Sequence, residues 1–195
     1  MAIAMSPTDE DLMARFLAGD LDSFGLLATR YQAPLRSLAA RYLGRAADAE
    51  EVGQEALLRA FTQARTFRPG SPFRPWLYRI ALNLCRDRHR RLRRIRWVSL
   101  GADGAEGAPA AAAISSREGT SIEAVERRED ARRVRRALAA LPEEQRAVLV
   151  LKEMEGMKFR EIAAVLGCPE STVKSRLYRG LVALRGQLLG QVARS

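Results

Sequence analysis

Hydroxyl, amine and guanidinium groups are concentrated on one short segment near the end of the chain. Its polar members are Ser171, Thr172, Lys174, Ser175, Arg176, Tyr178 and Arg179. Serine and threonine hydroxyls hydrogen-bond to bases or phosphates, whereas lysine and arginine favour the acceptor edge of guanine. The chemistry that these residue types predict is binding of nucleic acid rather than the making or breaking of covalent bonds.

The pattern that positions these side chains is a pair of helices with a tight break between them. Residues 159–166 have helical spacing and end at Gly167, and Pro169 stands at the first turn of the next helix, where its missing N–H costs nothing. Opposite the polar side chains runs an apolar stripe of Val173, Leu177, Leu181, Leu184 and Leu188. Two short helices with a glycine-containing turn are typical of a helix-turn-helix, whose second helix enters the major groove. From this segment alone, an ordinary amphipathic core helix with a solvated polar face stays an alternative.

A second group of polar residues carries the opposite charge. On a helix expected over residues 48–64, four side chains fall near one side: Asp48, Glu51, Gln54 and Glu55. In a chain whose formal net charge is +10, an acidic face suggests a basic protein partner. A solvated helix face explains the same pattern equally well when this helix is considered alone.

Aromatic and arginine side chains alternate in a third segment, SPFRPWLYRIALN, which contains Phe73, Arg74, Trp76, Tyr78 and Arg79. Aromatic rings beside guanidinium groups suit the unstacked bases of single-stranded nucleic acid, although one or two of these rings must belong to the core of so small a domain. The run that follows, residues 86–96, contains seven arginines. So dense a run indicates a track of phosphate contacts, each adding salt-sensitive affinity; a solvated helix end is the alternative.

The chain as a whole favours a polyanionic partner, with a membrane surface as the second candidate. It has 195 residues, enough for one or two domains, and arginine supplies nearly all of its positive charge because only three lysines are present. Cys85 and Cys168 are far apart and make no CxxC pattern, which argues against a disulfide framework and a structural zinc site. The sequence has no signal-peptide pattern, and no apolar run reaches the roughly 18 residues of a membrane span. A cytoplasmic protein without membrane insertion is therefore expected.

Helical periodicity recurs along the chain and sustained β alternation is absent, so the predicted fold is all-α. A first helix begins at Thr8, a second covers residues 23–43, a third covers residues 48–64, and a fourth begins at Pro75. Pro34 lies inside the second helix, where a kink or break is expected because proline lacks the N–H that a helix interior needs.

Composition divides these helices into two groups. Residues 98–119 are rich in Gly, Ala, Ser and Pro and have little to bury, which predicts a flexible linker. A capping-box pattern opens another helix at Thr120. Two small helical domains are therefore expected, over residues 8–97 and 120–195, and the second contains the helix-turn-helix.

Three motifs, taken in order, resemble a known family. They are DAEEVGQEALLRAF, then FRPGSPFRPWLYRIALNLCRDRHRR, and after the linker LPEEQRAVLVLKEMEGMKFREIAAVLGCPESTVKSRLYRGLVALR. In this order they are similar to the small bacterial sigma factors of the extracytoplasmic-function group. The resemblance covers nearly the whole chain outside its first few residues and the linker.

The resemblance implies a role for the first domain. Residues 8–97 are similar to the region-two domain, which binds the clamp helices of the polymerase β′ subunit and opens the −10 element. The positions that match the polymerase-binding helix are Asp48, Glu51, Gln54 and Glu55. Those that match the −10-reading surface are Arg65, Arg68, Phe73, Trp76, Arg79, Asn83, Asp87 and Arg90.

The resemblance also implies partners for the second domain. Residues 120–195 are similar to the region-four domain, which reads the −35 element and meets the β flap of the polymerase. The polar positions of residues 171–179 match its recognition helix. The implied partners are core RNA polymerase, promoter DNA and an anti-sigma factor that holds the protein inactive until a signal arrives. No cofactor and no metal is implied.

Three positions depart from the family pattern. Gly53 stands where an aliphatic residue is usual, which is expected to weaken that helix by up to about 1 kcal/mol relative to alanine. Pro75 replaces a small hydroxyl residue at a helix start, where proline is tolerated. Asp87 places an acid on the helix expected to face DNA.

Other classes of protein fit the residues less well. Three glutamates of one helix suggest a di-iron carboxylate bundle, but that chemistry requires Glu-x-x-His pairs, and His89 is the only histidine. Cys85 and His89 are four residues apart, yet two ligands do not make a metal site. An enzyme is therefore not expected. The main alternative is a helix-turn-helix regulator that binds DNA without polymerase, and such a protein has no need of the acidic helix.

Overall fold

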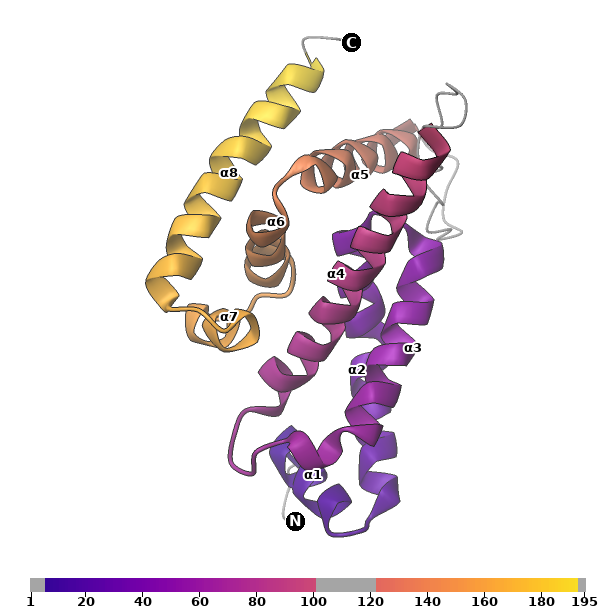
Figure 1. The fold of residues 1–195 in the computed structure, drawn as a ribbon, viewed down its shortest axis with the longest axis vertical. Coiled ribbons are helices and arrows are strands. Elements are labelled where there is room, and N and C mark those ends of the chain that lie inside the picture. Colours follow the sequence, from indigo (N-terminus) through magenta and orange to yellow (C-terminus); the bar gives the residue numbers. More distant parts are fainter. Residues whose placement is uncertain (1–5, 101–121, 193–195) are drawn as a thin grey trace.

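The computed structural model describes residues 6–100 and 122–192, and both ranges are helical, which confirms the all-α prediction (Figure 1). The N-terminal region, residues 6–100, contains α1 (Asp9–Leu17), α2 (Leu21–Leu43), α3 (Ala46–Thr62), the short 3₁₀ turn η1 (Ala64–Thr66) and α4 (Phe73–Leu100). The C-terminal region, residues 122–192, contains α5 (Ile122–Ala140), α6 (Glu143–Leu149), the π-helical turn η2 (Val150–Met154), α7 (Phe159–Leu166) and α8 (Glu170–Val192). Most of the expected linker and the capping box at Thr120 lie outside the described residues.

Local hydrogen bonds define several helix ends. Thr8 Oγ1 accepts a hydrogen bond from the Asp11 amide at 3.1 Å, and the Thr8 amide donates to the Asp11 carboxylate at 3.2 Å, forming a capping box. Asp20 accepts from the Ser23 amide at 3.3 Å, so α2 begins two residues earlier than the expected start at Ser23. Gly167, with φ of 64°, ends α7 as predicted.

Of the kink or break expected at Pro34, the break is not found, because α2 continues through this residue as one helix. Tyr31, Leu35 and Leu38 flank the proline and are at most 6% exposed. Their burial on both sides of Pro34 offsets the lost backbone hydrogen bond and keeps the helix intact.

The core of the N-terminal region lies where α2 packs against α3 and α4, while α1 crosses the end at which α4 begins (Figure 1). The apolar face of α2 is buried throughout, and consists of Phe24, Leu27, Tyr31, Leu35, Leu38 and Tyr42. Glu10 of α1 accepts a hydrogen bond from the Phe73 amide at 2.8 Å, so one helix supplies the N-terminal acceptor of another.

The C-terminal region is held together by helix contacts around α6. Arg146 is 2% exposed, and its guanidinium group donates to the carbonyls of Leu138, Ala139 and Leu141 at 2.8–3.0 Å. These carbonyls end α5, where no further turn is available to satisfy them. On α8, Val173 is fully buried but Leu181 is 43% exposed, so the predicted apolar stripe is covered only in part.

Glycine allows α2 and α3 to approach closely. Gly53 is buried on α3, and a Cβ atom placed there would lie 3.3 Å from the backbone nitrogen of Arg36 on α2. The departure from the aliphatic residue expected at this position therefore has a packing reason. Glycine lowers the helix propensity of α3 at this position, but its lack of a side chain allows the two helices to pack closely.

Replacing Gly53 tests this crossing. We expect Gly53→Leu to lower the free energy of unfolding by about 1–3 kcal/mol, because the new side chain must displace the α2 backbone. Gly25→Leu is the matched control, since Gly25 lies on α2 and a Cβ atom placed on it would meet nothing within 4 Å; it should raise the free energy of unfolding by about 0.5–1 kcal/mol. Urea titrations followed by circular dichroism measure both, and equal effects at the two glycines would contradict the crossing.

Candidate nucleic-acid interfaces and the contact between the two regions

The polar face of α8 is open over its first three turns. Ser171, Lys174, Tyr178 and Arg179 are all exposed, and Tyr178 has the largest exposure, at 72%. Val173 points inward between them and is fully buried, which fixes the orientation of the helix. These four predicted residues therefore lie together on one accessible surface, as a helix that enters a DNA groove requires.

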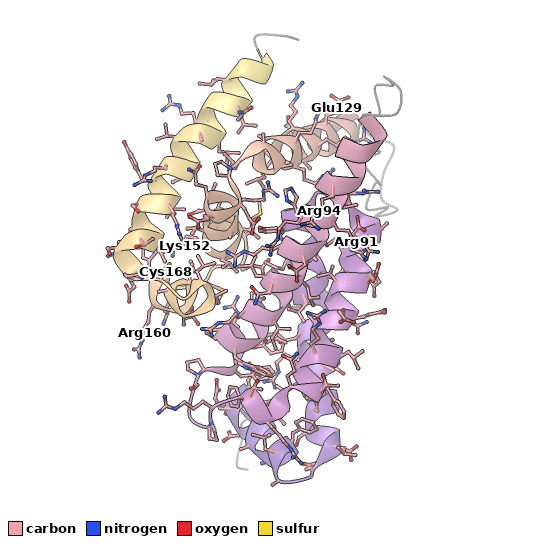
Figure 2. All side chains as sticks on the ribbon, in the orientation of Figure 1. Arg91, Arg94, Glu129, Lys152, Arg160 and Cys168 are labelled. Atoms are coloured by element: carbon pink, nitrogen blue, oxygen red, sulfur yellow. The ribbon has the colours of Figure 1, made fainter. Side chains whose placement is uncertain are left out.

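The other three predicted residues of α8 are half-buried and held by neighbours. Arg176 forms an ion pair with Glu144 of α6 at 2.6 Å, and its Nη1 lies 3.6 Å from the Sγ atom of Cys168. The hydroxyl of Ser175 donates to the Thr172 carbonyl at 3.0 Å. Cys168 lies at the junction of α7 and α8, and Arg160 projects outward from α7 (Figure 2). Arg176 thus positions α8 against α6 in this arrangement.

The carboxylates on the acidic face of α3 form ion pairs with nearby arginines. Asp48 lies 3.2 Å from Arg45 and 3.6 Å from Arg88 of α4, and Arg88 also pairs with Glu51. Glu55 pairs with the arginine one turn later at 2.8 Å, and Gln54 donates to the carboxylate one turn earlier at 3.2 Å. The Glu51 side chain is 70% exposed, so its pairing is weak and open to exchange with a partner's cation.

The predicted −10 residues divide into exposed and packed side chains. The exposed ones are Arg65, Arg68, Arg79, Asn83, Asp87 and Arg90. Phe73 is 1% exposed and packs in the core, and Trp76 lies half-buried with its ring centroid 5.7 Å from that of Phe73. The Phe73 ring therefore stabilises the fold and has no surface for a base in this arrangement. The carboxylate of Asp87 is 2.9 Å from the guanidinium group of Arg90, which compensates its charge on this helix.

The two regions touch through a contact that the sequence did not predict. Glu155, between η2 and α7, accepts hydrogen bonds from Arg41 at 2.9 Å and from the Tyr78 hydroxyl at 3.0 Å, and its side chain is only 7% exposed. Arg74 donates to the Glu155 main-chain carbonyl at 2.6 Å. Residues that are 77 to 114 positions apart in sequence meet here, and no periodic signal identifies such pairs.

Further contacts extend this interface along α4, against which α7 packs (Figure 1). Arg79 donates to the Ala164 carbonyl of α7, and Arg86 pairs with Glu143 of α6 at 3.0 Å. Arg146 lies 5.3 Å from the ring centroid of Tyr42, a cation–π contact between the regions. One of the residues predicted to read the −10 element, Arg79, is therefore engaged within the protein.

Burial changes the acidity of two groups beside this contact. Burial of Cys85 raises the pKa of its thiol to about 12. Burial also raises the pKa of Tyr78 to about 12, and the neighbouring Glu155 carboxylate adds to the effect. Both groups are neutral at physiological pH because their charged forms would be poorly solvated.

Neither a metal cluster nor a membrane helix is found in the ranges 6–100 and 122–192. Within these ranges, no three His, Cys, Asp or Glu side chains come together as metal ligands. None of the helices described there combines the length and apolar character that crossing a membrane requires.

Comparison with protein families finds one family model in each of the two regions. Residues 27–95 match the family model "Sigma-70 region 2", and residues 131–184 match the model "Sigma-70, region 4". The first match includes the acidic face and the −10 candidates, and the second includes the α7–α8 pair.

Whole-chain relatives and solved structures agree with these matches. The chain is 34% identical over 178 residues to the ECF RNA polymerase sigma-E factor of Escherichia coli (strain K12), covering 91% of this chain and 92% of that one. It is 36% identical over 177 residues to the RNA polymerase sigma-H factor of Pseudomonas aeruginosa, covering 90% and 91%. Its fold matches that of CnrH in complex with the cytosolic domain of CnrY, with a TM-score of 0.69 and 27% identity over 93% of this chain and 97% of that one. The fold of the sigma factor RpoE in complex with the anti-sigma factor NepR from Bartonella quintana also matches, with a TM-score of 0.67 and 24% identity over 86% and 98%.

The raised pKa values of Cys85 and Tyr78 predict a loss of stability at alkaline pH. In the unfolded chain these groups lose their protons near pH 9 and 10, whereas the folded protein retains them up to about pH 12. Their stabilisation is therefore complete below pH 9 and is lost as the pH rises toward 12. The free energy of unfolding, measured by urea titration across this range, should fall. Tyr78→Phe should make the fall above pH 10 shallower, while Tyr178→Phe at an exposed site should not; identical profiles for both variants would contradict this assignment.

Proposed function

The chain belongs to the bacterial sigma factors of the extracytoplasmic-function group, and we propose that its two regions divide promoter recognition between them. As a sigma factor it directs core RNA polymerase to specific promoters and is a transcription initiation factor. In the proposed division, the N-terminal region binds polymerase and opens the −10 element, while the C-terminal region reads the −35 element. The work takes place in the cytoplasm, where polymerase meets the chromosome.

The observation that carries this division is the order of surfaces along the chain. The region-two match contains both an acidic helix face and an exposed set of arginines on and before α4. The region-four match contains an open polar helix face on α8. The acidic face suits a basic partner protein, and the other two surfaces suit DNA.

The exposed residues have distinct proposed roles. Arg65 and Arg68 stand in the turn before α4 with exposed side chains, where they would contact the opened strand. Trp76 is the ring best placed to stack on a base, because it is half-buried against Phe73 but keeps an accessible part. On α8, Arg179 is the strongest candidate for a bidentate contact with guanine.

Regulation by an anti-sigma factor completes the proposal. Two solved structures of this fold were captured with a bound partner, one of them a sigma factor with its anti-sigma factor. A protein partner of this kind would hold the chain away from polymerase until a signal releases it.

Charge reversal on the acidic face tests the polymerase contact. In transcription reconstituted from purified protein, core polymerase and genomic promoter fragments, the unaltered chain should give defined 5′ ends that share −35 and −10 elements. Glu51→Lys combined with Glu55→Lys should abolish binding to core polymerase, because attraction to a basic partner becomes repulsion. Glu129→Lys combined with Glu153→Lys makes the same change in charge at exposed sites elsewhere and should retain binding. Unchanged polymerase affinity of the first variant, with duplex DNA binding intact, would favour a plain DNA-binding regulator.

Truncation of Arg179 tests the reading of the −35 element. Arg179→Ala should weaken use of the matched promoter by about 1–3 kcal/mol if the guanidinium group reads a base bidentately. Arg185→Ala, at another exposed position on α8, should have a smaller effect. The assay compares transcript yield on the natural promoter and on one with a scrambled −35 element. Loss of the same size on both promoters would remove Arg179 from base recognition.

A further inference from the structure

The aromatic ring of Phe159 contacts two of the chain's three lysines. Phe159 is the first residue of α7, and its half-buried side chain packs against the hydrophobic core. The ammonium nitrogen of Lys152, on η2, lies 4.8 Å from the centroid of this ring, and that of Lys174, on α8, lies 5.6 Å from it. Both distances are within the roughly 6 Å of a cation–π contact. One ring therefore connects η2, α7 and α8 through two positive charges.

The two lysines are held in different ways. Lys152 is half-buried near α7, and its ammonium group also donates to the Met157 carbonyl at 3.3 Å, which closes the turn between η2 and α7 (Figure 2). Lys174 is exposed, and among the described residues its ammonium group has neither an ion pair nor a hydrogen bond. Within the described part of the chain, the Phe159 ring is thus what holds the end of the Lys174 side chain.

The kind of partner decides whether a basic side chain keeps its charge for DNA. Arg176, two residues after Lys174, forms an ion pair with Glu144, so a carboxylate already compensates its charge. An aromatic ring attracts a cation through its quadrupole and accepts none of the cation's N–H donors in the way that a carboxylate does. An ammonium group is a compact charge with three donors on a flexible stem. The ring therefore orients Lys174 without neutralising it.

We propose that Phe159 is a positioning residue for recognition of the −35 element. Its ring holds Lys174 on the exposed face of α8, beside Ser171, Tyr178 and Arg179. A long side chain that is ordered in advance loses less conformational freedom when it binds DNA, and the affinity of the complex rises accordingly. The inference rests on the proposed reading of the −35 element by α8, and it adds a residue of α7 that acts through Lys174 rather than by touching DNA.

Packing alone is the other role that Phe159 can have, since its side chain also contacts the core. Phe159→Leu keeps an apolar side chain and removes the π face, whereas Phe159→Tyr keeps both. A role limited to packing makes the effect of Phe159→Leu independent of Lys174. A positioning role makes that effect vanish when the ammonium group is absent, which a double-mutant cycle with Lys174→Met measures.

The preference of the assembled polymerase for the −35 element is the first readout. The complete chain is combined with core polymerase, and its affinity is compared between the natural promoter fragment and one with a scrambled −35 element. We expect Lys174→Met to lower the ratio of the two affinities, and Phe159→Leu to lower it about two- to fivefold, the size of an exposed cation–π contact. Phe159→Tyr should retain the ratio. In a chain that already carries Lys174→Met, Phe159→Leu should lower it no further.

Equal losses from Phe159→Leu in the two backgrounds would overturn the proposal, and so would an unchanged ratio in Lys174→Met. Circular dichroism verifies that each variant is folded. If the unaltered protein binds both fragments equally, the reading of the −35 element by α8 is wrong, and the positioning role is wrong with it. Because that outcome appears before any substitution is made, the two failures are distinguishable.

The ring contact itself is the second readout, and it needs neither DNA nor polymerase. With isotopically labelled lysine, the complete chain gives one Cε–Hε signal in the nuclear magnetic resonance spectrum for each of Lys152, Lys158 and Lys174. The ring current of Phe159 should shift the signals of Lys152 and Lys174. Lys158 makes no cation–π contact among the described residues and is the internal reference. Phe159→Leu should move the Lys174 signal toward that of Lys158, and a Lys174 signal that stays in place would overturn the proposal.

Discussion

A guanidinium group carries its charge at every physiological pH, so each arginine that is removed from water needs oxygen acceptors. This constraint shapes the whole protein, whose net charge is +10 with only three lysines. Arg146 satisfies it by capping the end of α5, Arg176 by pairing α8 with α6, and Arg88 by joining α4 to the acidic face of α3. The same need brings Arg41 to Glu155 and so joins the two regions. These arginine contacts accompany a hydrophobic core that is continuous between the two regions.

Much of the fold was predictable because its signals are local. The apolar residues of α2 repeat at helical spacing, and the six that form its inner face are all buried. The threonine cap of α1 and the glycine end of α7 follow from side-chain and backbone preferences within a few residues. A break at Pro34 is absent because burial of the residues on both sides of it outweighs the local preference of proline. Leu181 is 43% exposed, whereas Leu184, further along the same stripe, packs against the cluster of Leu138, Leu141 and Leu149, so the stripe on α8 is covered unevenly.

The candidate site was predictable to a smaller degree. Residue type and spacing identified the polar face of α8, since a helix wheel needs only one segment. The partners of the acidic face were missed, because Arg88 lies on another helix far along the chain and one arginine looks like the next in a dense run. Phe73 was assigned to a surface because alternating rings and arginines do not reveal which ring turns inward; its neighbours Phe67 and Tyr31 decide that. The contact around Glu155 depends on how two regions meet across the intervening residues, a relation that no local pattern encodes.

The glycine crossing of α2 and α3 has a mechanical consequence. With no side chain between Gly53 and the Arg36 backbone, the two helices have no compressible layer at their closest point. Helix α3 carries the acidic face, and α2 carries Arg41 near its C-terminal end. The two helices are therefore held together as one rigid unit at this crossing. The acidic face of α3 and the Arg41 end of α2 therefore keep a fixed position relative to each other.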